Sequence, residues 1–455
     1  MTHGSKPKRI APGPRGHWLL GNLREFRRDV LGLIVDSARE FGDVVRFRLG
    51  TRVVHLLNHP DHAEYVLVRN ARNFDKRTRS AQLIKAITGE GLLTSNGEFW
   101  QRQRRLLQPA FHHRNIAGFA TEMTAATAAM LERWRECAVR GETLDVASEM
   151  MRLTYTIVGR TLFNFDAGPD AEMVERAMQI ILPHAFGRLG GFVNAPEWLP
   201  TPANRRFRSA LSEVDRVVYR IVAQRRRAQD TGALDGDLIS MLLRVRDGET
   251  GSGFSDEQLR NEAITFLLAG HETTANALAW TFYLLAQHPE SGRRISEEVA
   301  ATLGGRAPTL EDLARLPFTK SVIKEAMRLY PPIWIIERRV VRDDAVGGFF
   351  LPAGSAVVIA PYALHRHPGF WDRPDEFNPS RFAASTPPAY IPFGVGPRFC
   401  IGSEFAMLEA QLVVSMVVQA FRLETIAGRQ VLPLPGITLR MRGGMWMRPR
   451  GTSHS

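Results

Sequence analysis

Residues 392–407, "PFGVGPRFCIGSEFAM", place one of only two cysteines, Cys400, on a glycine-rich segment directly before a long apolar helical pattern. Gly394 and Gly396 allow the backbone to turn tightly and to approach a flat partner closely. We expect Cys400 to open the helix that follows, where unpaired N–H groups and the helix dipole stabilise a thiolate, a soft axial ligand for iron. The alternative is a small buried hydrophobic residue, the usual role of a single cysteine.

The composition describes a folded protein with a large core. Of 455 residues, 44% are hydrophobic and 23% charged, and the net charge of +12 comes from arginines dispersed along the chain. Because no basic cluster interleaved with aromatics stands out, we expect no nucleic-acid partner and favour an acidic partner or an anionic cofactor. Two distant cysteines fit a reducing cytoplasm, and no stretch has the apolar character of a signal peptide or membrane anchor.

The pattern along the chain predicts one mostly helical domain. Residues 43–58 indicate a hairpin, residues 98–330 are dominated by helical patterns, and short strands with a proline-rich meander follow the Pro pair at 331–332. Residues 434–450 alternate like a final hairpin. We therefore expect a single mostly α domain over residues 1–455, with small β-sheets at both ends and a flexible basic N-terminus over residues 1–15.

One helix is predicted to run through the core. Ser255 and Gln258 form a capping box, and Pro289 closes the far end of a span of roughly 30 residues, about 45 Å long. The helix is apolar nearly all round, yet its middle reads "AGHETT" at 269–274. Buried helix centres seldom carry a glycine beside a carboxylate and hydroxyls without a functional reason.

Together these stretches resemble the cytochrome P450 family. "FGVGPRFCIG" at 393–402 fills its haem-ligand signature, and "AGHETT" resembles its oxygen-activation motif. "KEAMRLYPP" at 324–332 supplies a Glu-x-x-Arg pair, and "NPSRF" at 378–382 looks like the meander motif, with Ser380 in place of the usual glutamate. "FWQRQRRLLQPAF" at 99–111 matches the helix whose Trp and Arg reach a haem propionate. The resemblance runs in the family's order from about residue 12 to the C-terminus and implies the cytochrome P450 fold.

The resemblance also implies a cofactor, haem b (iron protoporphyrin IX), with Cys400 as the metal ligand. Haem carries two propionates that need cations, and the matching positions are Arg104, Arg338 and Arg398, with Trp100 beside them. Phe393, Ala269 and Gly270 complete the cofactor-binding set, with Gly270 leaving room for dioxygen. The alternative for each arginine is an ordinary surface position.

Two further sets of residues have alternative roles. Thr273 either holds open a kinked helix turn by bonding a backbone carbonyl or delivers protons to the reacting oxygen, with Glu272 as the relay from solvent. Glu325 and Arg328, three apart on a helix, form either a surface pair or, with Arg381, the buried structural network that the resemblance implies.

The implied function is a haem-thiolate monooxygenase that uses O₂ and takes electrons from a separate redox protein. A peroxide-driven member of the same family and a haem-binding protein without turnover are the alternatives; the presence of Glu272 and Thr273 speaks against both. We expect an acidic ferredoxin or flavodoxin-type partner, steered by Arg102 and Arg105, which should project opposite to Trp100 and Arg104. We also expect a monomer.

The substrate is expected to be a lipophilic small molecule, most plausibly a terpenoid. The apolar residues expected to border the pocket are Phe266, Leu267, Ile333, Trp334, Ile335 and Ile336. Residues 199–211, "LPTPANRRFRSAL", resemble the corresponding stretch of bacterial terpene-oxidising members. The alternative is a fatty acid, whose carboxylate would need a cation such as Arg77, Arg79 or Arg205.

Overall fold

The computed structural model describes residues 9–163, 169–190, 196, 198–231, 236–248 and 250–452. The chain divides into two compact units, each built from two separate segments: residues 1–80 with 325–400, and residues 81–324 with 401–455. One boundary lies within α4 and another within α14. The expectation of one domain over 1–455 stays a prediction, and residues 1–8 lie outside the described residues.

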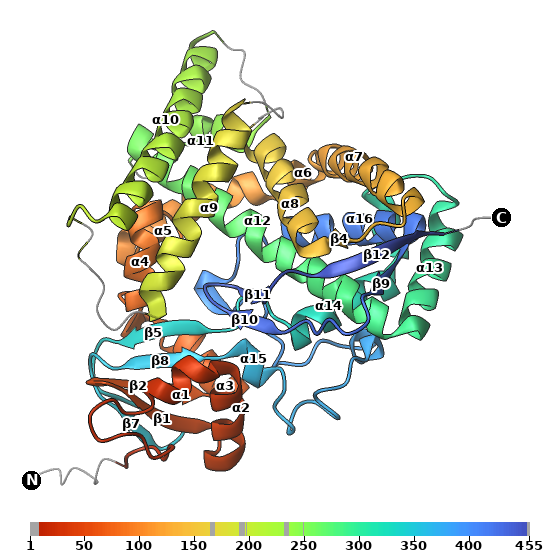
Figure 1. Ribbon diagram of the computed structural model, residues 1–455. Coiled ribbons are helices and arrows are strands. Elements are labelled where there is room, and N and C mark those ends of the chain that lie inside the picture. Colours follow the sequence, from red (N-terminus) through yellow and green to blue (C-terminus); the bar gives the residue numbers. More distant parts are fainter. Residues whose placement is uncertain are drawn as a thin grey trace, which may run out of the picture. The chain divides into compact units, whose positions relative to one another are not determined.

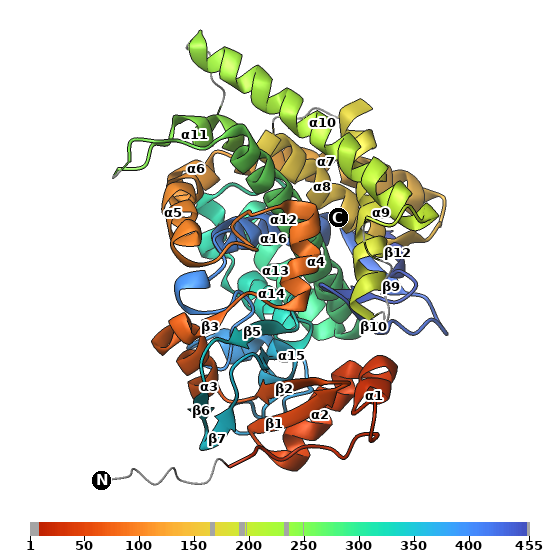
Figure 2. The same cartoon turned by 90° about the vertical axis from the view of Figure 1, so that its left-hand side faces the viewer.

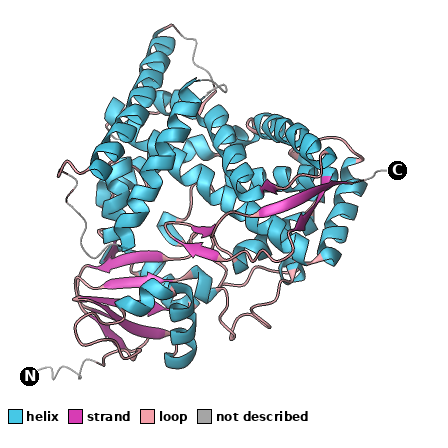
Figure 3. Ribbon diagram, viewed as in Figure 1, coloured by secondary structure: helices cyan, strands magenta, loops and turns pink. Residues whose placement is uncertain are grey.

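The first unit is organised around a five-stranded sheet of order β1-β2-β8-β5-β3, in which only the β2–β8 pair is parallel (Figure 3). β1 and β2 form the hairpin predicted for residues 43–58. The strands of this unit are β1 (Val44–Leu49), β2 (Arg52–Leu57), β3 (Phe74–Asp75), β5 (Ile336–Val340), β6 (Asp344–Val346), β7 (Phe349–Leu351) and β8 (Ala356–Ile359).

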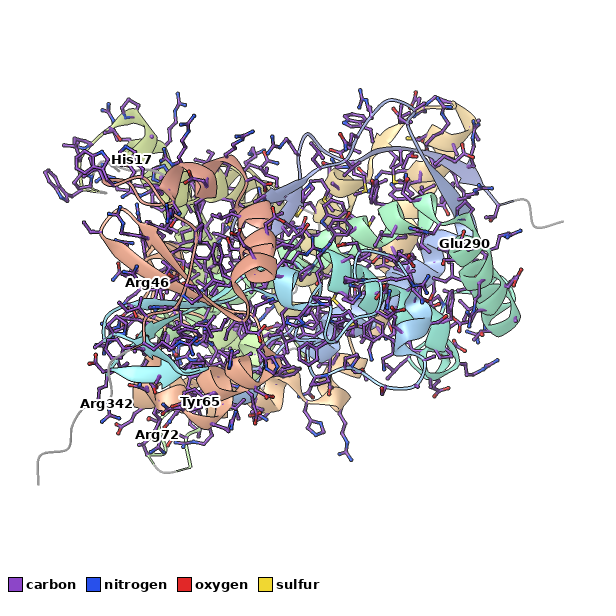
Figure 4. The ribbon with its side chains drawn as sticks, turned by 90° about the horizontal axis from the view of Figure 1, so that it is seen from below. His17, Arg46, Tyr65, Arg72, Glu290 and Arg342 are labelled. Carbon is purple, nitrogen blue, oxygen red and sulfur yellow. The ribbon has the colours of Figure 1, made fainter. Side chains whose placement is uncertain are left out.

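Short helices complete the first unit. They are α1 (Leu23–Arg28), α2 (Val30–Phe41), α3 (Pro60–Glu64), η1 (Tyr65–Arg69), η2 (Ala71–Asn73), α15 (Pro361–Leu364), η5 (Pro379–Phe382) and η6 (Gly396–Arg398). Tyr65, labelled in Figure 4, begins the π-helix η1, and its hydroxyl donates to Asp344 at 3.0 Å. Part of the expected flexible N-terminus is anchored here, since the Arg9 and Pro12 carbonyls accept hydrogen bonds from Phe350 and Arg46.

The second unit is mostly helical. Its longer helices are α5 (Gly97–Leu107), α7 (Ala120–Val139), α8 (Val146–Phe163), α9 (Pro169–Gly190), α10 (Pro202–Asp230), α12 (Asp256–Gln287), α13 (Pro289–Leu303) and α16 (Ser403–Ala420). It also includes α4 (Arg79–Thr88) except residues 79–80 and α14 (Pro317–Leu329) except residues 325–329, which belong to the first unit. Shorter ones are η3 (Gln108–Phe111), α6 (His113–Ala117), α11 (Leu238–Arg244) and η4 (Glu311–Arg315). α12 packs against α8, α10 and α16 and runs among them (Figure 1).

The predicted central helix is confirmed as α12. The Ser255 side chain accepts from the Gln258 N–H while the Gln258 side chain accepts from the Ser255 N–H, so both halves of the capping box are present. The helix ends at Gln287, just before Pro289 begins α13. Its residues are buried nearly all round from Leu259 to Leu285, as the apolar pattern predicts.

The final hairpin predicted for residues 434–450 is confirmed in part, because one antiparallel hairpin lies in this stretch but the last strand does not join it. β10 (Pro433–Pro435) pairs with β11 (Leu439–Met441), whereas β12 (Trp446–Gly451) joins a different sheet between β4 (Leu144–Asp145) and β9 (Phe421–Thr425). The Gly-Gly step at 443–444 therefore redirects the chain between two sheets. A local alternating pattern cannot distinguish this crossover from a hairpin turn.

Candidate functional site

The cysteine segment of the first unit is a loop held by its own backbone. The Cys400 N–H donates to the Phe393 carbonyl at 3.0 Å, and the Gly394 N–H donates to the Ile391 carbonyl at 3.0 Å. Gly394 and Gly396 have φ of 72° and 76°, in the left-handed region that favours glycine. Cys400 is exposed, so the loop presents its thiol at the surface of the described chain.

Gly396 has a second reason to be glycine. A Cβ at this position would lie 2.4 Å from the carbonyl oxygen of Leu67 in η1. The close approach that the sequence predicts is thus made to a neighbouring backbone of the same unit, whereas a Cβ at Gly394 would meet nothing nearer than Ile336, at 3.9 Å. Gly396 fixes the distance between the cysteine loop and η1.

Cys400 does not open the following helix, and this expectation is wrong. α16 begins at Ser403, with Gly402 as its N-cap residue. Cys400 therefore lies three positions before the first helical residue. Any stabilisation of its thiolate by the helix dipole acts across that gap and is weakened, because the dipole effect falls off within the first turn.

Three cations of the first unit influence one another. Burial lowers the pKa of Arg338 to about 10 and that of Arg398 to about 9, and the charge of Arg338 adds to the lowering at Arg398. The pKa of Lys76 lies well below its usual range, mainly because of burial and further because of the charges of Arg338 and Arg398. Asp75 offsets part of the effect at both arginines. This grouping of positive charge fits a ligand with two carboxylates, as haem has, because such a ligand would relieve the repulsion.

The predicted network of Glu325, Arg328 and Arg381 is confirmed as buried and structural. Glu325 and Arg328 are fully buried and form two parallel hydrogen bonds, Nε to Oε2 at 2.7 Å and Nη2 to Oε1 at 2.9 Å. Arg381 Nε donates to Glu325 Oε1 at 3.3 Å. Arg328 also donates to the carbonyls of His365 and Pro374 at 2.8 and 2.6 Å, so it joins the helix to the meander.

His365, which the sequence analysis missed, connects this network to the cysteine loop. Its Nε2 accepts from the Ile391 N–H at 2.9 Å, and its Nδ1 lies 3.2 Å from the Arg328 carbonyl oxygen. These contacts imply a neutral ring with the proton on Nδ1. Burial and the charge of Arg328 lower the pKa of His365 to about 3, which maintains that state. A lone histidine in a proline-rich meander carries no local signal of such a role.

In the second unit, α12 has one accessible window in its buried middle. Ala269 is exposed and Gly270 and Thr273 are partly buried, while the helix residues before and after them are buried. These positions lie on neighbouring parts of one helix face. A Cβ at Gly270 would lie 3.2 Å from Val158 Cγ2 of α8, so the glycine also allows the two helices to pack closely.

Thr273 uses its hydroxyl within the helix. Its Oγ1 donates to the Ala269 carbonyl at 2.7 Å, four residues earlier, and α12 is continuous through this turn. The carbonyl bond predicted for Thr273 is present. The proton-delivery role stays a prediction.

Glu272 points to a different neighbour. It is 1% exposed, and its Oε1 accepts from Arg440 Nε of β11 at 2.6 Å and from the Thr438 hydroxyl. Arg440, whose side chain is 26% exposed, places a cation between this carboxylate and solvent. The sequence analysis missed both partners, because they lie more than 160 residues further along the chain.

Trp100 and Arg104 lie on α5, with Trp100 buried and Arg104 half-buried. The side chains of Arg102 and Arg105 are 23% and 52% exposed, and both also reach a buried carboxylate. Arg102 Nε lies 3.6 Å and Arg105 Nη2 3.0 Å from Oδ2 of Asp247, whose side chain is fully buried. Both arginines therefore neutralise a buried carboxylate in the loop before α12.

Comparison with known proteins agrees with this geometry. The family described as Cytochrome P450 matches residues 11–446. The chain is 37% identical to cyclooctatin synthase of Streptomyces melanosporofaciens over 94% of this chain and 93% of that protein. It is 35% identical to cyclooctat-9-en-7-ol 5-monooxygenase of the same organism, over 95% and 92%, and 34% identical to pentalenene oxygenase of Streptomyces avermitilis, over 88% of each. The chain therefore belongs to the cytochrome P450 family and is a monooxygenase that binds haem b.

Proposed function

We propose that this chain oxidises a terpenoid and that Cys400 is the thiolate ligand of its haem. The observation that carries the assignment of the ligand is the exposed Cys400 thiol on a bonded loop, in the same unit as the cations Lys76, Arg338 and Arg398. When bound, haem with a thiolate ligand supplies the activation of O₂. The protein supplies the ligand, the counter-charges and the shape of the substrate space.

We propose that several basic residues bind the haem propionates. We assign the propionates to Arg338 and Arg398, with Lys76 as a third cation that the sequence analysis missed, and keep Arg104 and Trp100 of α5 as further contacts. Their support is the mutual lowering of pKa among Lys76, Arg338 and Arg398, which a ligand with two carboxylates would relieve. Phe393, Ala269 and Gly270 remain proposed cofactor contacts.

For proton delivery we propose Thr273 as the donor nearest the reacting oxygen and Glu272 as the relay. In the structure Thr273 donates to Ala269, so its hydroxyl must rotate to donate elsewhere. Glu272 is held by Arg440, and a proton entering from solvent would pass this partly exposed pair. A carboxyl group held at such a position can accept a proton and pass it on.

The proposed substrate class is supported by the relatives. Their names refer to the oxidation of cyclooctat-9-en-7-ol and pentalenene, both terpenoids. Among the residues expected to border the pocket, Phe266 and Leu267 are buried in the second unit, and Phe266 packs on Phe111 with ring centroids 5.0 Å apart. An apolar wall of this kind orients a hydrocarbon by its shape. Each CH₂ that is buried contributes about 0.8 kcal/mol to the free energy of binding.

A fatty acid is the second candidate, and exposed arginines favour it. Arg77 is 68% exposed, with its Nε 3.8 Å from an oxygen of Asp75, and Arg205 is exposed on α10. Either could bind a carboxylate. Arg79, also named for this role, lies at the start of α4 and is half-buried.

The redox partner that we propose is an acidic ferredoxin or flavodoxin-type protein. The net charge of +12 supports it, because opposite charge speeds encounter. Reversing the charges of Arg102 and Arg105 would remove the counter-charges of Asp247, so it would not test the partner alone. The dependence of the reduction rate on ionic strength tests the proposal without mutation: a rate that does not fall as salt rises contradicts it. A monomer in the cytoplasm stays a prediction; no described helix is long and apolar enough to cross a membrane.

Comparing a cyclic terpene hydrocarbon with a long-chain fatty acid tests the substrate class. We expect the terpene to shift the haem absorption spectrum at lower concentration and to give a hydroxylated product that carries one oxygen atom from ¹⁸O₂. Arg77→Ala and Arg205→Ala should leave this binding unchanged. Tighter binding and turnover of the acid, lost in either variant, would replace the terpenoid by a fatty acid.

A further inference from the structure

The connection between α4 and α5, residues 89–96, packs unusually closely against α12 within the second unit. A Cβ at Gly89 would lie 2.2 Å from Asn261 Oδ1, and a Cβ at Gly91 would lie 2.1 Å from Thr265 Oγ1. Only glycine fits at these two positions without displacing a side chain of α12. α4, α5 and α12 can be followed in Figure 2. We call residues 89–96 the α4–α5 loop.

Glu262 lies on α12 within this contact. Its side chain is completely buried, and its Oε2 accepts from the Leu92 N–H at 3.0 Å. Its Oε1 is buried and has no hydrogen-bond partner among the described residues. Burial raises the pKa of Glu262 to about 8, although the Leu92 hydrogen bond opposes part of that rise. At neutral pH the group is therefore a neutral carboxylic acid that fastens the loop through one backbone bond.

The position of Glu262 on α12 links the loop to the substrate side of the helix. Glu262, Phe266, Ala269 and Thr273 follow the spacing i, i+4, i+7 and i+11, so they lie along one face. Ala269, exposed in the window of the helix, is seven residues from Glu262, or about 10 Å along the axis. The α4–α5 loop thus covers the same helix face that carries the proposed oxygen site.

On its other side the loop is held by a side chain that does not titrate. Gln103 of α5, fully buried, donates from Nε2 to the Glu90 carbonyl at 2.9 Å and accepts from the Ser95 hydroxyl at 2.8 Å. An amide keeps these bonds at any pH of interest. The α12 side, in contrast, holds the loop through an ionisable group, Glu262.

The charged neighbours are engaged elsewhere. Arg260 of α12 donates to Asp215 of α10 at 2.7 Å and to the Asn261 side chain at 3.0 Å. Glu90, on the loop, pairs with Lys85 of α4 at the surface. These charges have partners other than Glu262, so ionisation would leave a buried carboxylate with one hydrogen bond among the described residues, which is costly unless water enters.

We propose that Glu262, in its protonated form, is a positioning residue that fastens the α4–α5 loop to α12 and so shapes the substrate space, and that its ionisation loosens the loop in alkaline solution. The effect on the substrate space rests on the proposed function, because that function identifies the substrate. We assign Glu262 no contact with cofactor or substrate, because it acts through the loop.

Hydrogen exchange of the haem-loaded enzyme tests the fastening directly. We expect the protection factor of the Leu92 amide, corrected for the intrinsic pH dependence of exchange, to fall at least tenfold between pH 7 and pH 9.5 in the wild type. The isosteric Glu262→Gln variant cannot ionise and should keep its protection. Glu298→Gln is the matched control, because Glu298 also accepts backbone N–H groups, those of Phe318 and Thr319; it should show the wild-type profile at Leu92.

Two outcomes overturn the proposal: a Leu92 protection factor independent of pH in the wild type, or the same alkaline loss in Glu262→Gln. Infrared difference spectroscopy of the wild type gives a measurement that needs no variant, since the carboxylic acid stretch of Glu262 must disappear around the pH at which the fall in protection levels off. The substrate part is tested by terpene affinity, which should weaken at alkaline pH in the wild type only. If no terpene binds at any pH while the exchange result holds, the proposed substrate fails and the fastening stands.

Discussion

Replacing Glu325 by Gln should destabilise the folded enzyme by about 3–5 kcal/mol, because it leaves the buried charge of Arg328 without its counter-ion. The carboxylate accepts two bonds from Arg328, one from the Asn378 N–H at 2.8 Å and one from Arg381. A glutamine has a single acceptor oxygen and no charge, so at least one of the Arg328 N–H groups loses its partner. Both side chains of the pair are 0% exposed, so water cannot replace it without local opening.

Urea denaturation of the haem-loaded enzyme measures this loss, with Glu424→Gln as the control. Glu424 pairs with Arg450 at 3.3 Å, but both side chains are about half exposed, and the cost should stay within about 1 kcal/mol. We also expect Glu325→Gln to reduce the share of the reduced carbon monoxide complex that shows thiolate ligation, because Arg328 and His365 connect this pair to Ile391. A free energy of unfolding within 1 kcal/mol of wild type would refute the reasoning.

Cys400→Ala should abolish the red-shifted Soret band of the reduced carbon monoxide complex; a retained band would exclude Cys400 as the ligand. Thr273→Ala should keep haem and substrate binding but divert electrons from product to peroxide or water, and unchanged coupling would leave Thr273 with only its bond to Ala269. Gly396→Ala should weaken haem retention, since its Cβ would meet the Leu67 carbonyl at 2.4 Å; wild-type retention would contradict that contact. Because the pKa of His365 is lowered to about 3, the unfolded chain binds the extra proton first, and stability should fall by up to about 1.4 kcal/mol per pH unit below pH 6.5. A His365→Gln variant should lose that slope in acid denaturation, and an unchanged slope would assign it to other groups.

Local patterns predicted those parts of the molecule that local physics determines. The capping box at Ser255 and Gln258 depends on residues three apart, and the hairpin of β1 and β2 depends on alternation around the turn at Gly50. The Glu325–Arg328 pair could be named from one helix turn. The burial of this pair was predicted from the family resemblance, because the segment itself does not indicate it.

Partners distant in sequence could not be predicted in this way. Glu272 meets Arg440 through the β10–β11 hairpin, and Asp247 attracts Arg102 and Arg105 from a loop about 140 residues away. The helical wheel set Arg102 and Arg105 apart from Trp100. It carried no information on which carboxylate would approach them, because that depends on the packing of other segments.

The division of the first unit into residues 1–80 and 325–400 has a consequence for synthesis on the ribosome. Strand β2 pairs in parallel with β8, joining Val54 to Ala356, and Lys76 meets Arg338 and Arg398 only after the later segment exists. At ~5–20 residues per second, translating the roughly 240 intervening residues takes on the order of 10–50 s. Strand β2 can pair with β1 but must wait for β8 throughout this interval, with an open edge that invites aggregation. Haem capture should therefore be a late event, beginning only when the ribosome has passed Cys400.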